Sequence, residues 1–306
     1  MKNFFRKIHT ERFRWYDEII IASLFSFLLV ILGQILGIII QNWMAKLFDQ
    51  TSPVYITFSS YFVTIGCWIV PLLYFLIFRH RRPILKALGT KPAGNNFRYL
   101  LLGLLIGFGL NFLCAMTAMI SKDIHLSFRT FDPLVFLLLL FAVFVQSSSE
   151  EVMDRGYLFQ VLIKGYRNKL VAIIGNTLIF ALMHFMNPGF TWLAMANIFF
   201  SGLLFSLFVY YFDSIWCPFG IHTGWNFTQS ILLGLPNSGL VMPYSIFELD
   251  TASARNSFVY NVAFGIEGTV FSTVILALAC LVTFLIGRKR AGKPMDIWEK
   301  KDIQPA

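Results

Sequence analysis

Long apolar stretches dominate this chain and constrain its fold more than any other feature. A helix needs about 20 apolar residues to cross the bilayer core, which is about 30 Å thick. With 57% apolar and only 13% charged residues, the sequence predicts an all-α polytopic membrane protein with eight transmembrane helices. The apolar runs lie near residues 19–41, 56–78, 99–120, 133–145 (continuing as helix beyond Glu150), 170–185, 192–212, 216–233 and 262–286.

Basic residues are distributed unevenly between the segments that connect these runs. Loops rich in Lys and Arg stay on the cytoplasmic side during insertion. With a cytoplasmic N-terminus, the inner segments 1–18, 79–98, 163–169 and 287–306 carry 20 Lys or Arg, whereas the outer loops carry four. Both termini are therefore predicted to be cytoplasmic. The basic patches adjoin span ends, so the net charge of +9 indicates anionic membrane lipid as a partner and argues against nucleic acid.

The chain shows no internal repeat, low-complexity tract or long linker. Residues 1–306 are therefore predicted to form a single transmembrane domain. The longest outer connection, 234–261, contains Pro236-Asn237 and Met242-Pro243 and is predicted to be a loop or lid. Four cysteines occur singly, without C-x-x-C spacing, and are predicted to be buried core residues rather than disulfides or zinc ligands. They are Cys67, Cys114, Cys217 and Cys280.

Ionisable side chains interrupt the fourth apolar run at Glu150, Glu151 and Arg155. Such residues are costly in hydrocarbon unless they are paired or line a wet cavity, so they indicate a functional site. Residues four apart share one helix face, so Glu151 and Arg155 can form an ion pair. Glu150 is rotated about 100° away, and we assign it as the reactive carboxylate that this pair supports. The alternative is an interfacial helix end, which the apolar stretch 157–163 disfavours.

Two histidines and an asparagine are predicted to approach Glu150. The polar stretch 165–169 is the turn of a helical hairpin, and Glu150 and His184 each lie 17 residues from its centre, so they should share one depth. His222 and Asn226 lie one helical turn apart in the seventh run. The hairpin arm rises about 25 Å from its turn, whereas His222 follows a cytoplasmic connection closely. A conical cavity open to the cytoplasm would reconcile these depths.

This cluster can activate water in two ways. His184, His222 and Glu150 can hold a divalent metal such as Zn²⁺. Alternatively, Glu150 is a metal-free general base tuned by His184, while His222 and Asn226 donate to the oxyanion. The residues leave this choice open, because the H-E-x-x-H zinc signature is absent. A serine nucleophile within Ser147-Ser-Ser149 is less favoured, because the G-x-S-x-G context is missing.

Two further polar positions lie near these motifs. Glu267, at the start of the last run, either faces the same cavity from the outer side or is an interfacial carboxylate. Asn176 lies eight residues before His184, and we expect it to form a hydrogen bond between packed helices.

Three ordered motifs resemble those of a known family. They are Glu150-Glu151-Val-Met-Asp-Arg155-Gly156, Phe180-Ala-Leu-Met-His184 and His222-Thr-Gly-Trp-Asn226. This order resembles the CPBP intramembrane proteases, which include type II CAAX prenyl endopeptidases, lysostaphin-resistance proteins and bacteriocin self-immunity proteins. The similarity covers about 136–230, within a catalytic core expected at about 130–235.

The resemblance implies an intramembrane endopeptidase acting on membrane-associated or lipidated peptides. In this reading Glu150 and His184 activate water, and His222 with Asn226 stabilises the oxyanion. Both metal-dependent and metal-free mechanisms are argued for the family, so the possible metal site of Glu150, His184 and His222 stays open. The resemblance also implies a multi-pass protein of a prokaryotic plasma membrane.

Two other functional classes are alternatives to a peptidase. One is a catalytically silent membrane scaffold or bacteriocin immunity protein that keeps the cluster for structure. The other is a transporter with a proton relay through Glu150, His184 and Glu267. The transporter is less favoured, because the sequence shows no repeated pair of broken helices.

Overall fold

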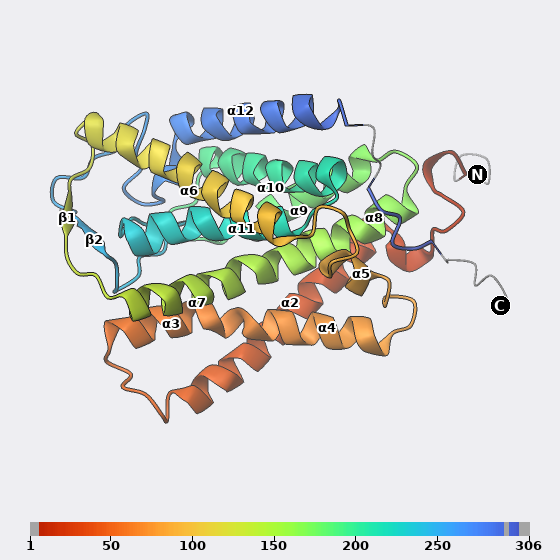
Figure 1. The fold of residues 1–306 in the computed structure, drawn as a ribbon, viewed down its shortest axis with the longest axis horizontal. Coiled ribbons are helices and arrows are strands. Elements are labelled where there is room, and N and C mark those ends of the chain that lie inside the picture. The colour runs from red at the N-terminus through yellow and green to blue at the C-terminus, as the bar shows by residue number, and fades with distance from the viewer. Residues whose placement is uncertain (1–5, 291–293, 300–306) are drawn as a thin grey trace.

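Six long apolar helices form the body of the protein. The computed structural model describes residues 6–290 and 294–299. Within these residues, six helices are long and apolar enough to cross a membrane, so the chain is a multi-pass membrane protein. They pack side by side (Figure 1). They are α2 (Ile19–Met44), α3 and α4 joined as Pro53–Ile77, α6 (Phe97–Ile120), α7 and α8 joined as Pro133–Gly165, α10 (Trp192–Phe212) and α12 (Val270–Gly287).

Two of the long helices contain breaks, and short helical elements lie between some of the long helices. The helix Pro53–Ile77 consists of α3 (Pro53–Phe62), the 3₁₀ turn Val63–Ile65 and α4 (Gly66–Ile77). The helix Pro133–Gly165 consists of α7 (Pro133–Glu151), the π-helical segment η3 (Val152–Leu158) and α8 (Phe159–Gly165). A 3₁₀ turn, Trp15–Asp17, precedes α2, and the short helix α5 (Ile84–Leu88) follows α4.

Two of the eight expected spans are helical but shorter than these six. Residues 170–185 form a π-helical turn, Val171–Gly175, and α9 (Asn176–Met183). Residues 216–233 form α11 (Trp216–Asn226) and the π-helical turn Phe227–Leu232. Every residue of α11 except the partly exposed Trp216 is buried, and the helix lies among α6, α7 and α10 (Figure 1). The crossing of the membrane by these two segments, and the cytoplasmic location of both termini, stay predictions.

The last expected span was placed too early. The run 262–286 becomes a helix only at Val270, and the preceding residues form turns and a 3₁₀ helix, Ile266–Gly268. The Asn261 side chain accepts hydrogen bonds from the backbone N–H groups of Ala263 and Phe264. Gly265 then adopts a φ of 87°, which a right-handed helix does not allow. Local turn chemistry therefore overrides the apolar character of this stretch.

The fold also contains a small sheet, which the all-α expectation missed. Strand β1 (Leu126–Phe128) pairs antiparallel with β2 (Phe247–Leu249), which belongs to the connection expected to be a loop or lid. The two strands lie at one end of the molecule, and the terminal segments lie at the other (Figure 1). An ion pair between Arg12 and Asp296, with an N–O distance of 2.5 Å, joins the two terminal segments.

Glycines allow two pairs of helices to approach backbone to backbone. On α6 and α11, a Cβ atom at Gly107 would lie 2.0 Å from the Ile221 carbonyl oxygen, and one at Gly224 would lie 2.4 Å from the Leu104 oxygen. Gly103 and Gly107 on α6, and Gly220 and Gly224 on α11, are each spaced by four, which is typical of membrane helix interfaces. On α2 and α4, a Cβ atom at Gly66 would lie 2.0 Å from the Gly33 oxygen.

All four cysteines are free and buried, as expected for core residues. One of them, Cys67, contacts Gly33 at the interface between α2 and α4.

We predict that Gly107→Ala lowers the free energy of unfolding by about 2 kcal/mol, because overpacking against the backbone of α11 forces that helix to move. Gly109→Ala is the matched control, since a Cβ atom there has no heavy atom within 4 Å. Thermal unfolding in detergent would compare the two variants. Equal stability of both would contradict the close approach of α6 and α11.

Candidate active site

The fourth long helix changes its winding immediately after Glu150 and Glu151. The α-helical hydrogen-bond pattern of α7 ends at Glu151 and gives way to the π-helical segment η3, all of whose residues are buried. Wider turns of this kind occur frequently at functional sites. The segment contains Asp154 and Arg155, so the motif predicted to carry the chemistry lies at this irregularity.

Glu151 and Arg155 form a fully buried ion pair, as their spacing predicted. The Arg155 Nη1 to Glu151 Oε1 distance is 3.2 Å, and neither side chain is exposed. The Nη2 atom of Arg155 donates to the Gly202 carbonyl oxygen at 2.9 Å. The guanidinium lies 4.4 Å from the ring centroid of Phe180 and 5.2 Å from that of Phe205. The pair thus joins α7, α9 and α10, and each charge has a partner.

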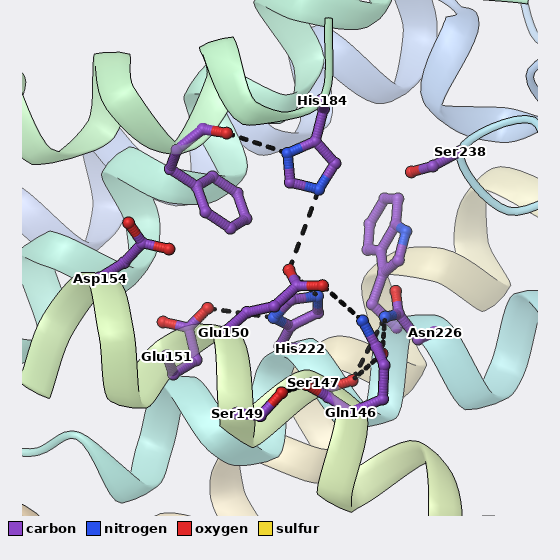
Figure 2. Close-up of polar contacts among 12 residues, drawn as sticks. Gln146, Ser147, Ser149, Glu150, Glu151, Asp154, His184, His222, Asn226 and Ser238 are labelled. Atoms are coloured by element: carbon purple, nitrogen blue, oxygen red, sulfur yellow. Dashed lines mark hydrogen bonds and ion pairs between the residues drawn. The ribbon is translucent and has the colours of Figure 1, made fainter. Parts of the chain in front are cut away.

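Both predicted histidines present Nε2 to Glu150. His184 Nδ1 contacts the Phe180 carbonyl oxygen at 2.9 Å, so Nδ1 must carry the proton and donate. His222 Nδ1 donates to Glu151 Oε1 at 3.0 Å. The Nε2 atoms of His184 and His222 then lie 3.9 and 3.8 Å from Glu150 Oε2, as Figure 2 illustrates. His184 and Glu150 therefore share one depth, as the hairpin argument predicted.

Asn226 also reaches the cluster, through a residue that sequence reasoning missed. Its Nδ2 donates to Gln146 Oε1 at 3.1 Å and to Ser147 Oγ at 3.2 Å. Gln146 Nε2 in turn donates to Glu150 Oε1 at 2.6 Å. The available signal was an amide side chain four residues before Glu150, at the end of an apolar run. The Ser147 hydroxyl accepts from Asn226 and donates to Gln146 Oε1, and neither of these partners is a general base.

Glu267 borders the same site from the end of the molecule that carries the strands. Its carboxylate accepts from Trp225 Nε1 at 2.9 Å and from the backbone N–H and hydroxyl of Ser238, both at 2.7 Å. The residue is 7% exposed. Burial raises the pKa of Glu267 above its ordinary value, against the opposing effect of these hydrogen bonds. Asn176, by contrast, joins packed helices through the Asp154 carbonyl and Ser206, as expected.

A cavity of about 380 Å³ contains the cluster. Its lining includes Glu150 and both histidines, Val30 and Gln34 of α2, and the loop residues Asn237 and Ser238. The cavity therefore extends from Glu150 toward the end of the molecule that carries the two strands. The predicted opening of this cavity to the cytoplasm stays a prediction.

The donor set has the chemistry of a metal site. Two imidazole Nε2 atoms face one carboxylate oxygen, and the opposite ring nitrogens are held by a carbonyl and a carboxylate, as is usual for metal-binding histidines. Zn²⁺ needs N and O ligands at about 2.0–2.2 Å. Among the described residues, however, no three His, Cys, Asp or Glu side chains are gathered closely enough to hold a metal ion. Metal binding by these residues therefore stays a proposal.

The comparison with protein families agrees with these motifs. Residues 132–228 match the family described as type II CAAX prenyl endopeptidase Rce1-like. This part of the chain is an Rce1-like domain of the CPBP family, and it contains the whole cluster from Gln146 to Asn226. No match was found among curated proteins or among solved structures.

We predict that Arg155→Lys lowers the free energy of unfolding by about 2 kcal/mol, because an ammonium group cannot reproduce the bonds to Glu151 and Gly202 together. Arg98→Lys, on the exposed surface of α6, is the control. Unfolding in detergent, followed by circular dichroism, would measure both. Unchanged stability of Arg155→Lys would show that the buried guanidinium geometry is not required.

Proposed function

We propose that this chain is an intramembrane endopeptidase that hydrolyses peptide bonds of membrane-associated or lipidated peptides. The observation that supports this most strongly is the approach of two histidine Nε2 atoms to one oxygen of Glu150 inside a cavity. The Glu150 Oε2 atom has no hydrogen-bond partner among the described residues. The match of residues 132–228 to an endopeptidase family supports peptide-bond hydrolysis as the reaction.

In the proposed reaction, Glu150 and His184 activate a water molecule. The 3.9 Å between Glu150 Oε2 and His184 Nε2 allows one water to donate to both atoms. Glu150 takes one proton as the water oxygen bonds to the scissile carbonyl carbon. The tetrahedral intermediate then breaks its carbon–nitrogen bond, and the proton passes from Glu150 to the leaving nitrogen. The products are one amine end and one carboxylic acid end, which becomes a carboxylate when it releases the second water proton to solvent.

His222 and Asn226 are proposed to stabilise the oxyanion. His222 is held by Glu151 through Nδ1, so in its imidazolium form Nε2–H is available for donation. Both hydrogens of Asn226 Nδ2 already have acceptors, Gln146 and Ser147. Donation to the oxyanion therefore requires exchange of one of these bonds.

A divalent metal such as Zn²⁺ would be held by Glu150, His184 and His222, and when bound it supplies Lewis acidity toward the carbonyl and the water. The metal-free route uses the same three side chains as base, water acceptor and oxyanion donor. The proposed location is a prokaryotic plasma membrane, with membrane lipid and a membrane-anchored peptide as partners.

We predict that Glu150→Gln lowers kcat about 1000-fold, because the amide cannot accept the water proton. The assay uses purified protein in lipid with a library of membrane-anchored peptides, and mass spectrometry identifies the products. Glu248→Gln is the control, as it removes an exposed carboxylate on β2. A parallel sample with a strong chelator separates metal-dependent from metal-free turnover.

Normal turnover by a folded Glu150→Gln variant would contradict the proposed peptidase. In that case a membrane scaffold or immunity role, in which the cluster serves structure, becomes the better account.

A further inference from the structure

One amide side chain contacts both the proposed base and the proposed oxyanion donor. Gln146 Nε2 donates to Glu150 Oε1 at 2.6 Å, and Gln146 Oε1 accepts from Asn226 Nδ2 at 3.1 Å. The Ser147 hydroxyl donates to the same Oε1 atom at 3.1 Å. The carboxylate can only accept, so the NH₂ group of Gln146 must face Glu150 and its oxygen must face Asn226. The contacts thus agree on one orientation of the amide.

The Glu150 carboxylate depends on this contact for its orientation. Among the hydrogen bonds of the described residues, the one from Gln146 is the only one that engages the carboxylate. The two histidine nitrogens lie at 3.8 and 3.9 Å, beyond hydrogen-bond distance. The Glu150 side chain is 30% exposed to the cavity, so packing alone does not immobilise it. Without Gln146, the carboxylate can rotate away from His184 and His222.

We propose that Gln146 is a positioning residue, which holds Glu150 Oε1 so that Oε2 faces the two histidines and at the same time orients Asn226. This inference rests on the proposed function, because it assigns Gln146 a role in the same reaction. Gln146 lies four residues before Glu150 on one face of α7, so the helix itself provides the register between the two side chains.

Two variants of Gln146 separate positioning from simple packing. Gln146→Leu keeps a similar volume but removes both hydrogen-bonding groups. Gln146→Glu keeps the shape and the acceptor for Asn226, but at neutral pH it places a second carboxylate beside Glu150. The matched control is Gln160→Leu, which removes another buried glutamine from the same long helix, outside the catalytic cavity. Folded fraction is measured for each variant by size-exclusion chromatography and thermal unfolding.

We expect Gln146→Leu to lower kcat about 10- to 100-fold, the effect of losing one hydrogen bond to a charged group, with KM changed less than about twofold. Gln146→Glu should lose as much at neutral pH and regain activity as the pH falls, because a protonated carboxyl group can again donate to Glu150. Wild type, Gln146→Leu and Gln160→Leu should lack this recovery at acidic pH. Loss of packing alone would not produce it.

Two results would overturn the inference. Gln146→Leu with wild-type kcat would do so, as would losses in both Gln146 variants that merely follow the folded fraction, without acid recovery. The proposed function is tested separately in the same assay by Glu150→Gln. Absence of Glu150-dependent cleavage in the wild type removes the proposed function and this inference together, whereas Glu150-dependent cleavage with an unaffected Gln146→Leu variant removes only the inference.

Discussion

The buried contact between Glu151, Arg155 and His222 is the interaction on which the rest of the site depends. Two opposite charges inside a helical bundle are tolerated only when each is paired and hydrogen-bonded. Arg155 pairs with Glu151 Oε1, donates to the Gly202 carbonyl and contacts two phenylalanine rings. Glu151 in turn fixes the ring of His222. The ring orientation of His222, a catalytic candidate, thus depends on the same carboxylate that neutralises the charge of Arg155.

Much of this arrangement was predictable because the relevant physics is local or periodic. Apolar run length indicated the six long helices, and the four-residue spacing of Glu151 and Arg155 indicated their ion pair. Equal distances from one turn placed Glu150 and His184 at the same depth. The three ordered motifs indicated the family that residues 132–228 match. Each inference used helix geometry or short motifs, and both can be read directly from the order of residues along the chain.

The features that escaped prediction depend on contacts between distant segments. The contact of Gln146 with Asn226 arises only in the folded protein, where α11 lies beside α7. The π-helical winding of Val152–Leu158 is likewise not indicated by any periodicity of the sequence. The strands pair residues more than 100 positions apart, and the late start of α12 reflects an asparagine turn followed by a glycine with positive φ. Tertiary context and turn chemistry determine these features.

Glycine contacts fix both α11 and α2, which line the cavity, against a neighbouring helix. The wall formed by α11 is locked against α6 by backbone contacts, so a larger side chain there displaces catalytic groups. The lining also includes Val30 and Gln34 of α2, a helix that packs mainly on α4 and carries no catalytic candidate. Substitutions on that face alter the shape offered to a substrate without moving the chemistry. Divergence in substrate preference can therefore accumulate on α2 while the reaction itself is preserved.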